Sequence, residues 1–237
     1  MATLKTAWLN LRYSIPERIE AFRLGLERHG FTVRYGISPT PGARDVLVTW
    51  NRVGQVDQIA GRYGQVLVAE NAAWGNGLAG RRWISLARDR HNTAGVFPVS
   101  GAERWDALGV ELQPWRNEGE TVLLPQRGIG SAPTAMPRDW LIGAQARFPG
   151  RVRRHPGRGD AKPLEGDLAR CGRVVTWGSG AAVQALMWGI PVVSDMPDWI
   201  GAQDNTDAGR LEMLRRMAWA QWTLEEVAAG APFERLL

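Results

Sequence analysis

The stretch that decides the fold is Val174-Val-Thr-Trp-Gly-Ser-Gly-Ala-Ala-Val-Gln-Ala-Leu-Met-Trp-Gly-Ile-Pro-Val-Val193. Its pattern predicts a buried strand, a turn of small residues, a short helix and a second buried strand. Gly189 and Pro191 are typical of a helix end that returns the chain to a sheet. We therefore predict a parallel sheet with the turn at residues 178–180 on its carboxyl edge, where open α/β folds bind ligands.

The chemistry of this turn favours an anion. Gly178, Ser179 and Gly180 have little side-chain bulk, so backbone N–H groups at this turn can approach a ligand closely. The turn also opens a helix, and the free N–H groups and dipole of a helix N-terminus attract negative charge. The sequence thus predicts a phosphate or similar group at the start of this helix.

The rest of the chain alternates in the same way. Apolar strands alternate with helices in both halves, which predicts parallel sheets covered by helices. We expect strands at 6–11, 31–35, 45–50, 65–70, 120–125 and 151–155, and mostly helix over 206–230. The predicted fold is α/β, with two Rossmann-like domains at 1–118 and 119–237 that face each other across a cleft. The last helix is expected to contact the first domain.

The composition is that of a soluble globular protein. The chain has 237 residues, of which 44% are hydrophobic and 22% charged, with no apolar run of membrane-spanning length. A single cysteine, Cys171, excludes an internal disulfide and a cysteine-cluster metal site. No signal peptide is recognisable at the start of the chain. We predict a cytoplasmic protein that is a monomer or a weak dimer.

The charge balance is basic. A net charge of +5 and a pI near 10.1 favour an acidic or phosphorylated partner, although a GC-rich genome also enriches arginine over lysine. The densest basic stretch covers residues 147–158 and holds five arginines and no acid. Something near this stretch is expected to need positive potential.

Three short segments of the second half carry a family resemblance. They are Leu123-Leu-Pro-Gln-Arg127, Arg153-Arg-His-Pro-Gly157, and the glycine turn with the helix behind it. Their order resembles the donor half of the GT-B glycosyltransferases and is most similar to capsule Kdo transferases and bacterial sialyltransferases. The resemblance covers about the last half of the chain, and the first half shares only the Rossmann-like alternation.

The resemblance implies a site for a nucleotide-sugar donor. The donor-binding residues it implies are Gln126, Arg127, Arg154, His155, Gly178, Ser179, Gly180, Ala181 and Gln184. Many family members have Glu where Gln184 stands, so the nucleotide stays open between a UDP-sugar and a CMP-sugar. The sequence has no Asp-x-Asp metal clamp, which favours a metal-independent site with no cofactor besides the donor.

The first half is expected to supply the acceptor side. Glu70 ends a predicted strand, and we predict it as the general base, the alternative being a surface carboxylate beside a turn. His155 is the second predicted catalytic residue. The predicted acceptor-binding residues are Asn51, Arg52, Asn71, Trp74 and Arg81. A Gly- and Asn-rich loop cannot easily bury a large ring by itself, so Trp74 is expected to stack on a sugar or a base.

These inferences lead to one predicted activity with alternatives. The first is an inverting glycosyltransferase acting on hydroxymethylated bases of viral or prophage double-stranded DNA, which requires base flipping. The second is a glycosyltransferase of bacterial surface polysaccharide. The third is a non-catalytic protein that binds a nucleotide sugar or a nucleic acid.

Overall fold

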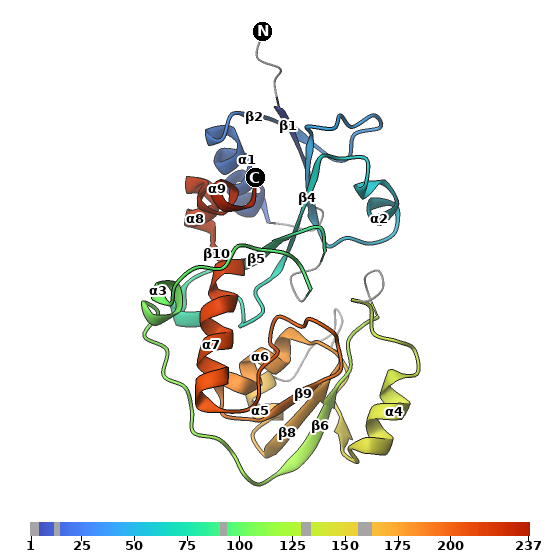
Figure 1. The fold of residues 1–237 in the computed structure, drawn as a ribbon, viewed down its shortest axis with the longest axis vertical. Helices are drawn as coiled ribbons and strands as arrows, with labels where there is room; N and C mark the ends of the chain where they lie inside the picture. Colours follow the sequence, from blue (N-terminus) through green and yellow to red (C-terminus); the bar gives the residue numbers. More distant parts are fainter. Residues whose placement is uncertain (1–4, 12–14, 91–93, 129–133, 156–162) are drawn as a thin grey trace. The chain divides into compact units, whose positions relative to one another are not determined.

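The computed structural model describes residues 5–11, 15–90, 94–128, 134–155 and 163–237, and these form two compact units (Figure 1). Unit 1 comprises residues 1–72, 76–100 and 218–237, and unit 2 comprises residues 73–75 and 101–217. Compared with the predicted domains 1–118 and 119–237, residues 101–118 lie in unit 2 and the last twenty residues lie in unit 1.

Unit 1 is built on a six-stranded sheet, called sheet A here. Its strands are β1 (Lys5–Asn10), β2 (Phe31–Tyr35), β3 (Val46–Trp50), β4 (Gln65–Asn71), β5 (Trp83–Arg88) and β10 (Gln221–Thr223). Their order is β10-β5-β4-β3-β1-β2. The four strands β1 to β4 are parallel, whereas β5 pairs antiparallel with both β4 and β10. The short apolar runs read from the sequence are therefore parallel strands, as predicted.

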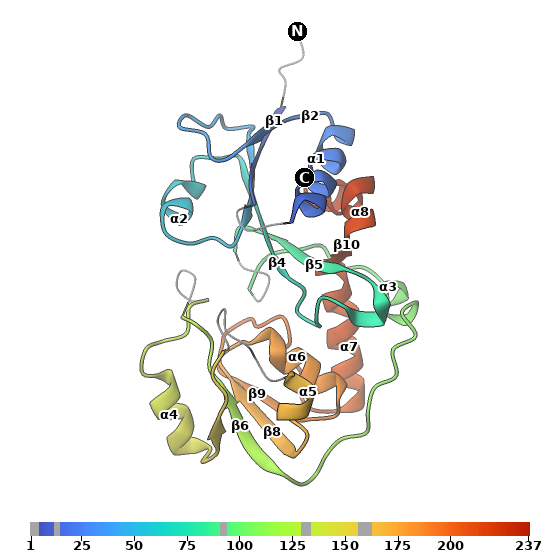
Figure 2. The same ribbon diagram turned by 180° about the vertical axis from the view of Figure 1, so that it is seen from behind.

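Helices cover both faces of sheet A (Figure 2). Helices α1 (Pro16–Arg28), α8 (Leu224–Ala229) and α9 (Ala231–Leu236) cover one face, and α2 (Gln55–Ala60) covers the other. Successive strand residues point to opposite faces, so Val48 packs towards α1 and Leu47 packs towards α2. Both faces are buried, which is why these strands read as continuous apolar runs.

Close contact between α1 and α8 depends on a glycine. A Cβ atom at Gly25 would lie 2.0 Å from the carbonyl oxygen of Val227, so only glycine lets the two helices approach this far. Phe22 of α1 contacts Phe233 of α9 beside this crossing, with ring centroids 5.9 Å apart. The end of the chain thus completes the core of unit 1.

The prediction of mostly helix over residues 206–230 is wrong at one place. Helix α7 (Asp207–Met217) and the 3-10 turn η2 (Ala218–Ala220) are followed by strand β10. Gln221 is buried and donates from Nε2 to Oγ of Ser85 at 3.0 Å, and Trp222 is buried in the core. Pairing with β5 overrides the local helical preference because it buries these side chains.

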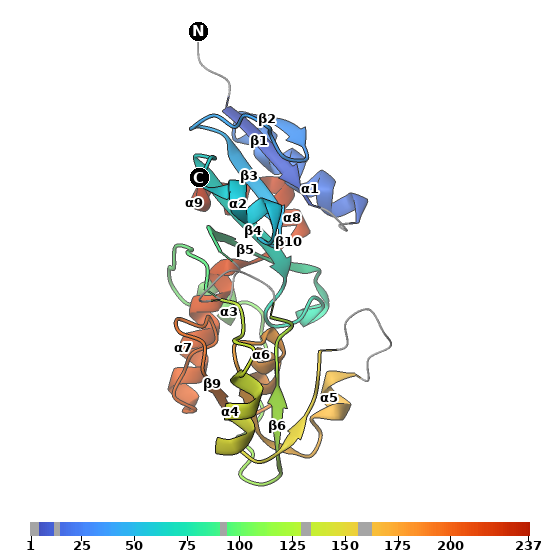
Figure 3. The same cartoon turned by 90° about the vertical axis from the view of Figure 1, so that its right-hand side faces the viewer.

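Unit 2 contains a second, fully parallel sheet, called sheet B. Its strands are β6 (Glu120–Leu124), β7 (Arg151–Val152), β8 (Cys171–Thr176) and β9 (Val192–Ser194), in the order β7-β6-β8-β9. Helices α4 (Trp140–Arg147) and α5 (Leu164–Asp167) lie on either side of β6 (Figure 3). Helix α6 (Gly180–Met187) connects β8 to β9, and the short α3 (Glu103–Asp106) and η1 (Leu78–Gly80) lie outside the sheets.

The stretch Val174–Val193 folds as predicted into strand, turn, helix and strand. Gly189 has φ +72°, and a Cβ atom there would lie 2.0 Å from the carbonyl oxygen of Pro114. Glycine is required at this helix end by its left-handed backbone and by the close neighbour. The protein is therefore an α/β protein with two Rossmann-like units. No helix in the described ranges combines the length and apolar character needed to span a lipid bilayer.

Candidate functional site

The carboxyl edge of sheet B gathers polar side chains from neighbouring strands. Gln126 and Arg127 follow β6, residues 153–155 follow β7, and the glycine turn follows β8. Because β6 lies between β7 and β8, the ends of all three strands meet at this edge. Pro156 and Gly157, which belong to the predicted motif, lie outside the described residues.

Two hydrogen bonds hold the glycine turn to β6. The buried hydroxyl of Thr176 donates to the carbonyl oxygen of Leu124 at 2.8 Å and accepts the N–H of Ser179 at 3.0 Å. Gln126 donates from Nε2 to the carbonyl oxygen of Gly178 at 2.7 Å. Gln126 therefore lies beside the turn, where it supports the backbone.

The start of α6 is a capped helix N-terminus. Ser179 accepts the N–H of Ala181 on its Oγ at 3.2 Å, and its carbonyl oxygen accepts the N–H of Ala182 at 3.1 Å. Within the described part of the chain, no acceptor is found for the N–H of Gly180. An anion at this helix end would provide that acceptor and interact favourably with the helix dipole.

The same helix start is packed on its sides. A Cβ atom at Gly178 would lie 2.9 Å from Sδ of Met196, and one at Gly180 would lie 3.4 Å from the carbonyl oxygen of Ala73. The side chain of Gln184 lies within 3.4 Å of the position of a Cβ atom on Gly75. The small residues of the turn are thus explained in part by internal packing, a contribution that the sequence interpretation omitted.

Two arginines and a histidine follow the ends of β6 and β7. Partial burial of the His155 ring, followed by the charges of Arg127 and Arg153, lowers the pKa of His155 below its usual value. Arg153 forms an ion pair with Asp167, Nε to Oδ2 at 2.5 Å, which balances its charge. For Arg127, which is exposed, no ion pair exists among the described residues. We call Arg127, Arg153 and His155 the carboxyl-edge cluster.

The remaining second-half predictions lie around this cluster. Arg154 is exposed beside His155, and Ala181 lies in the first turn of α6. Sequence reasoning assigned no role to Arg153 or Thr176. Arg153 was visible as part of the basic stretch, whereas only the fold shows that Thr176 connects two strand ends.

Two of the predicted acceptor residues, Arg52 and Asn71, form side-chain hydrogen bonds within unit 1. Arg52 donates from Nε to Oδ1 of Asp57 at 2.9 Å. Asn71 accepts on Oδ1 from Asn76 at 3.1 Å. Asn51 adopts φ +65° directly after β3, and Arg81 is exposed after η1. Arg52 and Asn71 thus contact their own loops, and the predicted role of all four residues in binding stays a prediction.

Trp74 differs from its expected exposure. Its side chain is only 2% exposed, and its ring lies against Trp105 of the same unit with centroids 5.6 Å apart. The expectation of a ring free to stack on a ligand is wrong, because Trp105, distant in the sequence, provides the partner. Glu70 is half-buried on β4 and pairs in register with Ser85, and it belongs to unit 1, whereas His155 belongs to unit 2.

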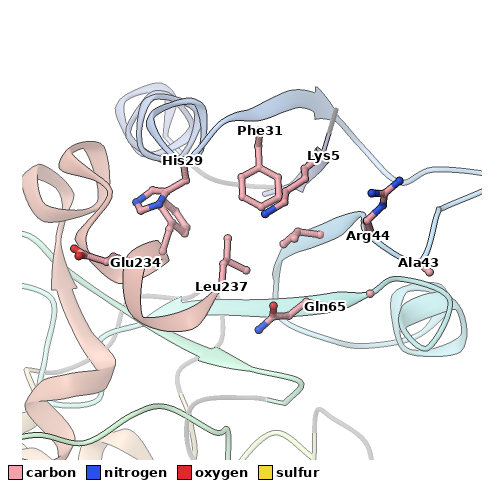
Figure 4. A pocket seen from close by; sticks show the side chains of 11 residues that line it. Lys5, His29, Phe31, Ala43, Arg44, Gln65, Glu234 and Leu237 are labelled. Carbon is pink, nitrogen blue, oxygen red and sulfur yellow. The ribbon is translucent and has the colours of Figure 1, made fainter. Parts of the chain in front are cut away.

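A cavity of about 360 Å³ lies at the amino ends of the parallel strands of sheet A (Figure 4). It is lined by the side chains of Lys5, His29, Phe31, Arg44, Gln65 and Glu234, among others. His29 there contacts the carbonyl oxygen of Gly230 through Nε2 at 2.9 Å, and Glu234 adds an acid to the basic side chains. The cavity lies away from the strand ends that bind ligands in open α/β sheets. Within the described ranges, no cluster of three His, Cys, Asp or Glu side chains is arranged to hold a metal ion.

Comparisons with known proteins give little similarity. No family model matches the sequence, and no curated protein matches it. Among solved structures, aspartate transcarbamoylase from Trypanosoma cruzi in complex with phosphate is 14% identical, with a TM-score of 0.27, covering 91% of this chain and 82% of that chain. A putative aspartate carbamoyltransferase from Leishmania major is 13% identical, with a TM-score of 0.27, covering 90% of this chain and 81% of that one. Likeness at this TM-score assigns neither a family nor an activity to this chain.

The predicted glycosyltransferase identity is corrected by these comparisons. The similar structures are named as carbamoyltransferases, and neither a family model nor a curated protein supports the Kdo-transferase or sialyltransferase resemblance. The predictions withdrawn with it are the GT-B class, glycosyl transfer to DNA or polysaccharide, the nucleotide-sugar and DNA partners, and the non-catalytic nucleotide-sugar or nucleic-acid binder. The motif of strand, glycine turn and helix is shared by many Rossmann-like sheets, so it indicated the fold and not the substrate.

Proposed function

We propose that unit 2 binds a small phosphorylated molecule at the carboxyl edge of sheet B. The observation that carries this proposal is the carboxyl-edge cluster, in which the charges of Arg127 and Arg153 both act on His155. Like charges repel, so gathering them at one edge is unfavourable unless an anion balances them. Arg153 pairs with Asp167, whereas Arg127 forms no ion pair with any acidic side chain in the described ranges.

The neighbouring helix start supports the same ligand chemistry. The N–H of Gly180 and the dipole of α6 favour an anion, and Gln126 and Thr176 hold the turn against β6. We assign the anion-contacting roles to Arg127, His155, Ser179 and Gly180, with Arg154 as an additional exposed cation. A phosphate dianion suits this arrangement because its several oxygens accept from more than one donor.

His155 is a local reporter for the test. The chain has three histidines, so the ring proton signals in an NMR titration are few and the His155→Gln variant assigns the one of interest. Inorganic phosphate, compared with chloride at equal ionic strength, is expected to raise the pKa of His155 in a saturable manner. Ligand binding would also stabilise the protein by about 2.7 kcal/mol at a hundredfold excess over Kd.

Two arginine variants make the test specific. Arg127→Ala is expected to weaken phosphate binding about tenfold, or about 1.4 kcal/mol. Arg173→Ala is the matched control, because Arg173 is an exposed arginine within β8 and away from its carboxyl end. The proposal fails if phosphate leaves the His155 titration unchanged, or if both variants weaken binding equally.

A further inference from the structure

Sheet A has its own carboxyl edge, and the connections of its strands single out one place on it. Strand β1 connects through α1 to β2 on one side, and β2 then connects to β3 on the other side of β1. The chain therefore reverses its direction of winding between β1 and β3. Ligands of open α/β sheets bind outside the carboxyl ends of the strands at such a switch point.

A polar contact joins the two strand ends at this point. The buried Asn10 at the end of β1 donates from Nδ2 to Oγ1 of Thr49 at 3.2 Å, and Thr49 donates to the carbonyl oxygen of Asn51 at 2.9 Å. Trp50 is the last residue of β3 and is half-buried. Hydrogen-bonded polar side chains thus lie at the switch point, near the indole ring of Trp50.

Two arginines lie at the carboxyl edge of sheet A near this switch point. Arg18, in the first turn of α1, lies over the ring of Trp50, with Cζ 4.2 Å from the ring centroid. Arg82 directly precedes β5, whose Ile84 pairs with Asn71 at the carboxyl end of β4. Burial is the first cause that lowers the pKa of the Arg18 guanidinium, and the positive charge of Arg82 is the second. We call Arg18, Trp50 and Arg82 the Trp50 cluster.

This cluster lacks the partners that its charges require. Nε of Arg18 is buried and has no hydrogen-bond partner within the ranges that the structure describes. Neither Arg18 nor Arg82 forms an ion pair with any described acidic side chain. Burying a guanidinium N–H without an acceptor is unfavourable, and a second cation nearby adds repulsion. An acceptor with negative charge would remove both costs.

We propose that the Trp50 cluster is a second anion site, independent of unit 2, which binds a phosphate group of a small molecule. Phosphate fits better than a carboxylate because the cluster holds two uncompensated positive charges, which a dianion balances. The planar guanidinium of Arg18 is held by the ring of Trp50, so its remaining N–H groups are oriented before the ligand arrives. Arg82, which is exposed, would approach the anion from the solvent side.

Trp50 gives this site a reporter of its own. In protein labelled with ¹⁵N at the indole nitrogens, the Trp50→Phe variant identifies the Trp50 signal. Inorganic phosphate, added at constant ionic strength to the full chain, is expected to shift this signal in a saturable manner. Acetate is expected to bind at least tenfold more weakly, since it carries one charge.

Variants decide whether the arginines are responsible. Arg82→Ala removes an exposed side chain, so the protein is expected to fold normally, and the apparent Kd for phosphate should rise about tenfold. Arg18→Lys keeps the charge but removes the planar group, and it should also weaken binding. Arg28→Ala is the control, because Arg28 is an exposed arginine at the other end of α1.

Failure of this proposal is distinguishable from failure of the function proposed for unit 2. Arg127→Ala should leave the phosphate response of Trp50 unchanged, and Arg82→Ala should leave the titration of His155 unchanged. The proposal is overturned if the Trp50 signal does not respond to phosphate. It is equally overturned if Arg82→Ala and Arg18→Lys bind like the Arg28→Ala control.

Discussion

The hydroxyl of Thr176 donates a hydrogen bond of 2.8 Å to the carbonyl oxygen of Leu124, and this contact joins the ends of β8 and β6. The hydroxyl oxygen of Thr176 also accepts the N–H of Ser179, so one fully buried side chain positions the glycine turn. The candidate site in unit 2 depends on this connection, because the turn and the cationic side chains come from different strands.

The first prediction concerns this hydroxyl. Thr176→Val keeps the shape of the side chain but removes the hydrogen-bond partner of a buried carbonyl and of the half-buried N–H of Ser179. The free energy of unfolding should therefore fall by about 1–3 kcal/mol. Thr121→Val on the neighbouring β6 is the control, since no side-chain hydrogen bond of Thr121 occurs among the described residues. Urea denaturation of both variants measures the difference, and equal stability of the two would contradict the assigned role.

The second prediction compares two glycines of unit 2. Gly189→Ala places a methyl group 2.0 Å from the carbonyl oxygen of Pro114 at a φ of +72°, so we expect a loss of about 3 kcal/mol or more. Gly143 lies within α4 with open space around its Cα atom, so Gly143→Ala should gain up to about 1 kcal/mol. Thermal melts of the two variants should therefore shift in opposite directions.

The third prediction concerns Arg210, which is 3% exposed on α7. Its Nη1 donates to the carbonyl oxygens of Gln113 at 2.9 Å and Leu186 at 3.1 Å, and its guanidinium lies over the ring of Trp115. Arg210→Ala removes both hydrogen bonds and the packing on Trp115, so the free energy of unfolding should fall by about 3 kcal/mol.

The control for Arg210 is Arg138→Ala, because Arg138 is exposed and should tolerate truncation within about 0.5 kcal/mol. Guanidinium chloride denaturation of the two variants provides the measurement. A loss for Arg210→Ala no larger than that for Arg138→Ala would show that the buried guanidinium is not structural.

The fourth prediction is a pH dependence of stability. Burial and the charges of Arg127 and Arg153 lower the pKa of His155 in the folded protein. As the pH falls through the ordinary histidine range near 6.5, the unfolded chain therefore takes up a proton that the folded protein does not. The wild type should lose stability relative to His155→Gln between about pH 7.5 and pH 5.5. Parallel pH profiles in chloride buffers would refute this effect.

The fifth prediction concerns the pH dependence of anion binding, which should be opposite to that of stability: a lower pH favours binding. Sulfate stays a dianion over this pH range, so its affinity reports the charge of the protein. Because a bound dianion favours the protonated ring of His155, the Kd for sulfate should fall as the pH is lowered from about 7.5 to 5.5. His155→Gln should remove most of this dependence. A pH-independent Kd in the wild type would argue against contact between the anion and His155.

The candidate site was only partly predictable. The positions of Gln126 and the glycine turn could be predicted because each follows an apolar strand, and parallel strands end at a common edge. The strand expected over 151–155 comprises only Arg151–Val152, so His155 follows this strand and does not end it. The substrate class was wrong, because strand, turn and helix describe a backbone shared by many proteins. The contact of Trp74 with Trp105 and the packing of Gly178 on Met196 involve residues too distant in the sequence for any local pattern to show.

The sequence by itself determined the order of strands and helices over most of the chain. Apolar runs, capping residues and helix-ending glycines act within a few residues, so their signals are local. Only the tertiary structure decided that residues 221–223 join sheet A as β10, and that Arg18 lies over the ring of Trp50 at the end of β3. These arrangements depend on contacts between distant segments, whose free energy exceeds the local preferences that a sequence displays.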